Sequence, residues 1–149
     1  KGSLHTKKRP IYEYDLKDKS VKCINRDNTI ETSMLYHGKL FFADPKDSHI
    51  KAYHIFSKQV EDIAPFKKHA GKLNQMSSDG IVRLNYVVHP DTTDSKPYMQ
   101  AYDVRKKAFL FPDYKPQYDV YRHVKNGYIG SIHFEATYFD KHMKPSILK

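Results

Sequence analysis

The sequence predicts a mainly β domain, an antiparallel sandwich or partly open barrel of about eight to ten strands with one short helix near residues 65–76. Three observations support this fold class. Short runs of β-branched and aromatic residues recur along the chain, turn-forming residues separate them, and a single segment has helical spacing. The 149 residues fit one domain with a sizeable core, and no linker composition interrupts them. We therefore expect a single domain over residues 1–149.

The clearest local signal is a hairpin within residues 118–139. Asn126-Gly127 suits the two positive-φ positions of a type I′ turn, and β-branched and aromatic residues extend on both sides. A turn at these two residues would place Val124 opposite Ile129. We expect the other strands to complete a sheet on this hairpin.

A second two-residue turn is predicted at His37-Gly38, which would pair Leu35 with Leu40. Further turns are expected where Asp, Asn, Ser, Pro and Gly cluster. The remaining strands are predicted at residues 11–16, 21–24, 30–36, 39–43, 49–56, 81–88, 98–104 and 108–111.

The predicted helix begins near Pro65, a residue favoured in the first turn of helices. Phe66, Ala70 and Leu73 follow at helical spacing. Gly71 costs about 1 kcal/mol there relative to Ala. We therefore expect a helix of only a few turns.

Both ends of the chain are basic. Residues 1–9 lack periodicity and carry adjacent cations, which predicts a flexible basic arm. Residues 140–149 are interpreted as a basic tail.

A short pattern recurs three times. Tyr14-Asp15-Leu16, Tyr53-His54-Ile55 and Tyr102-Asp103-Val104 each precede a lysine by three positions. A propeller or solenoid would produce such a repeat, but the spacings are unequal. We interpret the pattern as convergent strand-turn-strand chemistry.

Cysteine content and hydropathy exclude several classes of protein. The single cysteine, Cys23, permits no intrachain disulfide and no four-thiolate zinc site, and we expect it to be a small buried residue. This is compatible with the cytoplasm or nucleus without deciding the localisation. The chain contains no run of 18 non-polar residues, so no transmembrane helix is predicted. No nucleotide-binding or metal-binding spacing is found, so we predict no cofactor and no metal.

Charge gives the main functional signal. The formal net charge is +9 at pH 7, which favours polyanions such as nucleic acid or an acidic membrane surface. Most of the cations are lysine, which also covers ordinary soluble surfaces. Aromatic residues interleaved with cations suggest base stacking beside phosphate contacts. The predicted nucleic-acid contacts are Lys7, Lys8, Arg9, Arg105, Lys106, Lys107, Tyr121, Arg122, Lys125 and Tyr128.

The sequence thus favours a non-catalytic binding module that contacts a polyanion, nucleic acid first and acidic lipid second. Two alternatives remain. One is a protein-interaction or structural module that uses sheet edges or an aromatic patch.

The other alternative is a metal-independent ribonuclease built from His123, His133, Lys125 and Tyr121. The two histidines have opposite face parity in the predicted hairpin, which argues against this set. No catalytic residue is assigned.

Overall fold

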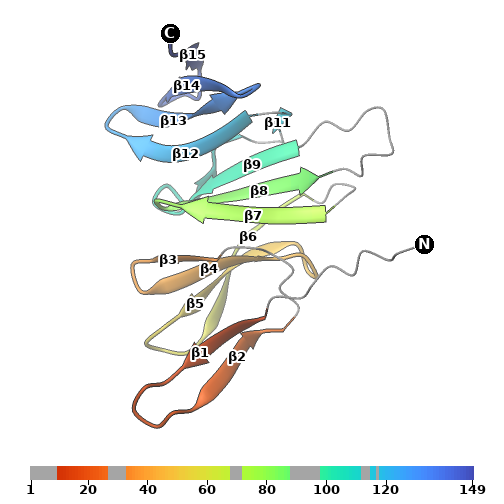
Figure 1. Cartoon of the computed structure of the whole chain (residues 1–149), viewed down its shortest axis with the longest axis vertical. Helices are drawn as coiled ribbons and strands as arrows, with labels where there is room; N and C mark the ends of the chain where they lie inside the picture. Colours follow the sequence, from red (N-terminus) through yellow and green to blue (C-terminus); the bar gives the residue numbers. More distant parts are fainter. Residues whose placement is uncertain (1–9, 27–32, 68–71, 88–97, 112–114, 117) are drawn as a thin grey trace, which may run out of the picture.

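The computed structural model describes the whole chain except residues 1–9, 27–32, 68–71, 88–97, 112–114 and 117. Within those bounds the chain is built from strands β1 to β15, with no helix. The strands form four antiparallel sheets that follow one another in sequence order along the long axis of the molecule (Figure 1). The mainly β prediction is confirmed, but the sheets form a stack of layers and not a barrel.

The first sheet is a two-stranded hairpin. It consists of β1 (Ile11–Tyr14) and β2 (Val21–Asn25). Cys23 lies in β2 and is half-buried. Polar residues with strong turn preference, including Asp15 and Asp18, connect the two strands.

The second sheet has four strands in the order β3 (Met34–Tyr36), β4 (Lys39–Asp44), β5 (His49–His54) and β6 (Val60–Pro65). The predicted His37-Gly38 turn is confirmed. Both turn residues have positive φ, and Leu35 faces Leu40 as expected.

The third sheet runs β7 (Lys72–Ser78), β8 (Ile81–Val87), β9 (Tyr98–Asp103) and β10 (Ala108–Phe109). A short strand β11 (Lys115–Pro116) pairs with the other end of β9, so β10 and β11 lie on the same side of that strand.

The fourth sheet runs β12 (Tyr118–Val124), β13 (Gly127–Ile132), β14 (Glu135–Asp140) and β15 (Pro145–Ile147). The segment predicted as one hairpin therefore forms three strands. Part of the predicted basic tail is an edge strand, β15, where a proline is tolerated.

The predicted turn of the β12–β13 hairpin is displaced by one residue, so the predicted pairing of its strands is wrong by two residues. Val124 faces Gly127 and the turn is Lys125-Asn126, because Gly127 is needed for close packing and not for a turn. A Cβ at Gly127 would lie 2.0 Å from the carbonyl oxygen of Phe139 in β14. An irregularity between Val120 and Arg122 then shifts the pairing again.

The predicted helix near residues 65–76 is also wrong. Pro65 ends β6, and Lys72 begins β7; residues 68–71 of the predicted helix lie outside the described residues. Leu73 and Gln75 are two residues apart in β7 and are both buried, as expected for one face of a strand. Gln75 lies against β4, where its side-chain oxygen accepts the N–H of Ala43 at 2.6 Å.

The core lies between sheets. In β8, Val82 packs into a cluster shared with the second sheet, while Ile81 packs into a cluster shared with the fourth. In β9, Tyr102 belongs to the cluster shared with the second sheet, and Ala101 belongs to the cluster shared with the fourth. The third sheet is therefore covered on both faces, which accounts for its almost continuous run of buried residues.

The three copies of the recurring Tyr-containing pattern adopt the same local structure. The first copy ends β1, and the other two end β5 and β9, the third strands of their sheets. All three lead into equivalent turns, with Lys19, Lys58 and Lys107 all at positive φ, 58°, 60° and 54°. A meander of four strands stacked on the next is the unit of propellers and solenoids. The copies are unequally spaced mainly because residues 88–97, which join β8 to β9 within the third sheet, form a longer connection than residues 45–48, which join β4 to β5 in the second.

The described residues include no helix with the length and non-polar character needed to cross a bilayer.

Candidate polyanion-binding surface

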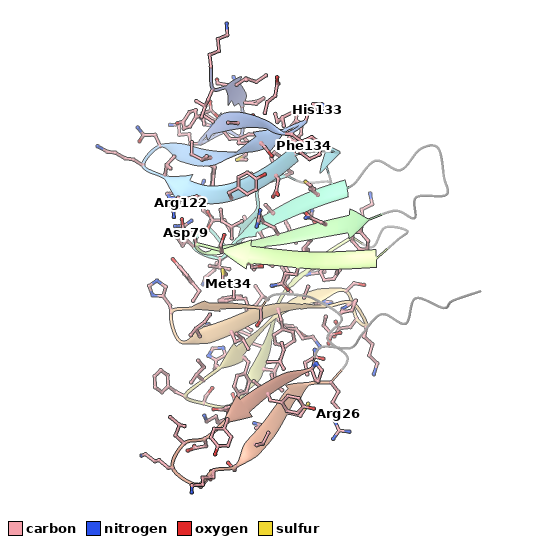
Figure 2. The ribbon with its side chains drawn as sticks, viewed as in Figure 1. Arg26, Met34, Asp79, Arg122, His133 and Phe134 are labelled. Atoms are coloured by element: carbon pink, nitrogen blue, oxygen red, sulfur yellow. The ribbon has the colours of Figure 1, made fainter. Side chains whose placement is uncertain are left out.

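Antiparallel meanders place successive turns at opposite ends of the strands, so the first and third turns of each sheet lie on the same side. In the stack, the β3–β4, β5–β6, β7–β8, β9–β10 and β12–β13 turns lie on the same side, at the left in Figure 1. The β13–β14 turn, with His133 and Phe134, lies on the opposite side (Figure 2). We call the first side the turn edge.

The β9–β10 turn is held by a buried carboxylate. Asp103 is fully buried, and its Oδ1 accepts the backbone N–H of Arg105 at 2.9 Å and of Lys106 at 3.4 Å. Its Oδ2 accepts the hydroxyl of Tyr128 at 2.7 Å. Burial alone would raise the pKa of Asp103, but the hydrogen bond from Tyr128 and those from the turn hold it below the usual value. The turn therefore presents its cations on a fixed scaffold.

The β14–β15 turn uses the same chemistry. Asp140 Oδ1 accepts the N–H of Lys144 at 2.9 Å and of His142 at 2.8 Å, and these bonds hold the pKa of Asp140 below its usual value. Met143 has positive φ, 61°, and closes the turn. Lys141 and His142 are exposed at its tip.

The β12–β13 turn lies between these two turns. The hydroxyl of Tyr138 donates to the carbonyl of Asn126 at 2.9 Å, which ties the turn to β14. His123 packs edge-on against Tyr128, with ring centroids 5.2 Å apart. Lys125 is exposed beside them.

The three turns line an open pocket of about 520 Å³. Three lysines contribute to its wall, one from each turn: Lys106, Lys125 and Lys141. None of the three forms an ion pair with another described residue. The ammonium group of Lys106 lies 4.9 Å from the ring centre of Tyr128. The remaining wall is formed by His123, Asn126, Gly127, Tyr138, Asp140 and His142.

The pocket has the charge and donor pattern of an anion site. Its lining contains three lysines and a single carboxylate, Asp140, whose Oδ1 already accepts two backbone N–H groups. Lysine ammonium groups supply three hydrogen-bond donors each, and the histidine rings and the Asn126 amide add further donors. Phosphate oxygens are suitable acceptors for such a set.

Other predicted contacts are tied to nearby acids. Arg105 Nε lies 3.4 Å from Asp103, and Arg122 Nε lies 3.6 Å from Asp79 (Figure 2). Lys107 lines a separate cavity of about 220 Å³ that also contains acidic side chains. These cations are therefore partly balanced.

The two predicted aromatic contacts differ. Tyr128 is fully buried, so its ring offers no face to a base. Tyr121 is 41% exposed, and the guanidinium of Arg83 lies 5.0 Å from its ring centre. Lys7, Lys8 and Arg9 lie outside the described residues.

The histidine pair considered for a ribonuclease is separated. His123 lines the pocket at the turn edge, whereas His133 forms the β13–β14 turn on the other side (Figure 2). No group of three or more His, Cys, Asp or Glu side chains among the described residues is arranged to hold a metal ion.

Sequence reasoning missed Lys141 and His142, which were assigned to a tail. The signal for them is the repeat itself: an aromatic residue followed by Asp precedes a cationic turn at Tyr102-Asp103 and again at Phe139-Asp140.

Comparison with protein-family models and with curated proteins found no match.

Proposed function

We propose that this chain is a non-catalytic binding module whose turn edge contacts a polyanion, with nucleic acid as the first candidate. The observation that carries the proposal is the pocket where Lys106, Lys125 and Lys141 meet without acidic partners among the described side chains. These lysines are distant in the sequence, and the repeated turns bring them together. Such a cluster favours phosphate oxygens over neutral ligands.

Salt dependence tests the electrostatic part. If each of the three lysines neutralises one phosphate, the logarithm of the binding constant should fall with the logarithm of salt concentration with a slope of about −2 to −3. Binding of fluorescent single-stranded and duplex oligonucleotides, measured by anisotropy over a salt series, gives this slope. No binding at low salt, or binding that salt does not weaken, contradicts the proposal.

A matched pair of variants tests the location. Lys125→Gln should weaken binding and reduce the size of the salt slope by about one. Lys46→Gln makes the same charge change in the exposed β4–β5 turn, on the opposite side of the sheet, and should leave both unchanged. Equal losses in the two variants would point to net charge alone and would remove the pocket from the proposal.

Acidic vesicles provide the comparison with a membrane surface. Phosphatidylcholine vesicles with and without phosphatidylserine are tested by co-sedimentation beside the oligonucleotides. Salt-sensitive binding to the oligonucleotides with little vesicle binding supports nucleic acid. Binding to the acidic vesicles alone contradicts it and favours the lipid alternative.

Exposed non-polar side chains favour a second candidate, a protein-interaction module. Phe134 is 95% exposed in the β13–β14 turn, and Leu16 is 83% exposed after β1. These residues lie away from the pocket, so the two functions use different surfaces.

A further inference from the structure

The first sheet is half of a repeat unit. Asp15 N–H donates to the carbonyl of Ser20 at 3.0 Å, just as His54 N–H donates to that of Gln59 at 2.9 Å. With the positive-φ lysines already described, this equates β1 and β2 with β5 and β6, the third and fourth strands of the second sheet. Among the described residues, no strand corresponds to the first two.

The second and third sheets show what pairs with the end of the third strand in a complete sheet. Ile55 N–H donates to the carbonyl of Gly38 at 3.1 Å, and Val104 N–H donates to that of Gly80 at 3.0 Å. Each glycine ends a two-residue turn in the preceding hairpin, with φ of +71° and +76°. The same hydrogen bond thus closes two consecutive sheets.

Leu16 occupies the position of Ile55 and Val104, one residue after the residue that starts the turn. Ile55 and Val104 are half-buried, whereas Leu16 is 83% exposed. No described glycine carbonyl accepts its N–H.

The backbone of β1 presents a second unpaired position. Asp15 directs its N–H toward β2, and successive strand residues direct their amides to opposite sides. The N–H and C=O of Tyr14 therefore point to the other edge. Its equivalent, Tyr53, faces Leu40 of β4 at that edge.

We propose that the free edge of β1 binds an antiparallel β-hairpin whose two-residue turn ends in glycine. The second strand of this hairpin pairs with Tyr14, and its turn glycine accepts the N–H of Leu16. Strand addition of this kind is a common mode of peptide recognition, because an edge strand offers unpaired backbone groups. The partner is a strand pair of the β3–β4 type, which would complete a four-stranded sheet.

A peptide from the chain itself is the probe. Residues 34–44 contain β3, the His37-Gly38 turn and β4, and cyclisation keeps the isolated hairpin folded. With isotope-labelled protein, about 1 mM peptide should slow amide hydrogen exchange at Tyr14 and Leu16 by about tenfold or more. No change at either amide overturns the proposal.

Two controls address the geometry. Tyr14→Pro removes the N–H that faces the free edge without removing one that faces β2, so it should abolish peptide binding, whereas Tyr14→Val should retain it. If the proline variant does not fold, the peptide supplies the same test. Leu40 faces Tyr53 in the second sheet, so N-methylation at this residue of the peptide should block binding. Unchanged binding by the folded Tyr14→Pro protein, or unchanged binding of the N-methylated peptide, overturns the proposal.

A second copy of the chain is the competing occupant. If sedimentation shows a dimer in which the Tyr14 amide is protected without peptide, two β1 edges pair with each other and the hairpin proposal fails.

Discussion

Two turns of this molecule have the same sequence pattern and different surroundings. Asp15 in the first sheet and Asp103 in the third both accept the N–H of the residue two positions later, at 2.8 and 2.9 Å. Asp103 also accepts the hydroxyl of Tyr128 from the next sheet, whereas Asp15 is only half-buried. The turn is determined locally, and the neighbouring sheet determines what that turn contributes to stability.

The tyrosine before each aspartate shows the largest contrast. Tyr102 is 3% exposed and packs edge-on against Phe109, with ring centroids 5.1 Å apart, whereas Tyr14 is 54% exposed. Tyr102→Ala should lower the free energy of unfolding by about 4 kcal/mol, and Tyr14→Ala by less than about 1 kcal/mol. Urea denaturation measures both. Equal losses would mean that the outer face of the first sheet is covered in solution.

The second-largest difference in the free energy of unfolding is expected between the two aspartates. Asp103→Ala removes the acceptor of a buried hydroxyl and of the turn amides, and we expect a loss of about 3 kcal/mol. Asp15→Ala frees an N–H that water can reach, so the loss should be below about 1 kcal/mol. The same urea titrations compare them. A loss at Asp15 as large as that at Asp103 would contradict the role given to the neighbouring sheet.

Acid unfolding isolates the charge of Asp103. Its pKa is held below the usual 3.8 in the folded protein, so its stabilising contribution is complete above that value and is lost as the pH falls through the folded pKa. In Asp103→Asn the decline in the free energy of unfolding below about pH 4 should be shallower than in the wild type. Urea midpoints measured between pH 2 and 6 follow the difference, since both proteins can be compared in the same series. Parallel curves would show that other groups cause the decline.

The smallest effect concerns the contact that joins the first two sheets. The hydroxyl of Tyr53 donates to Glu13 of β1, and Lys58 also pairs with that carboxylate. Burial and the bond to Glu13 raise the pKa of Tyr53 to about 12. Tyr53→Phe should cost about 1 kcal/mol, whereas Tyr12→Phe, on an exposed ring, should cost nothing measurable in thermal unfolding. If Tyr53→Phe left the stability unchanged, this contact would contribute nothing to it.

Local signals in the sequence predicted the elements that depend on local chemistry. The β3–β4 hairpin was predicted with its register because His37-Gly38 adopts the positive φ values that its residue types favour. At Asn126-Gly127 the same signal failed. There the glycine is required by the carbonyl of Phe139 on a neighbouring strand, and no local rule contains that contact.

The helix prediction failed for a related reason. Phe66 and Leu73 have helical spacing, but Phe66 follows β6 and donates its N–H to Ser48 at 2.8 Å, while Leu73 belongs to the next sheet. Of the pocket lysines, Lys106 and Lys125 were predicted from the density of cations. Lys141 was missed because a strand that contains Pro145 was interpreted as a tail.

The order of the sheets along the chain has a consequence for folding. In the described residues every strand pairs within its own sheet, and each core cluster joins two sheets that are consecutive in sequence. Strand pairing therefore needs no contact between sheets that are far apart in the sequence, and ordering can begin in one unit and spread to the next. We expect unfolding to start at the thinly covered first hairpin, so that amide protection rises from there toward the third sheet.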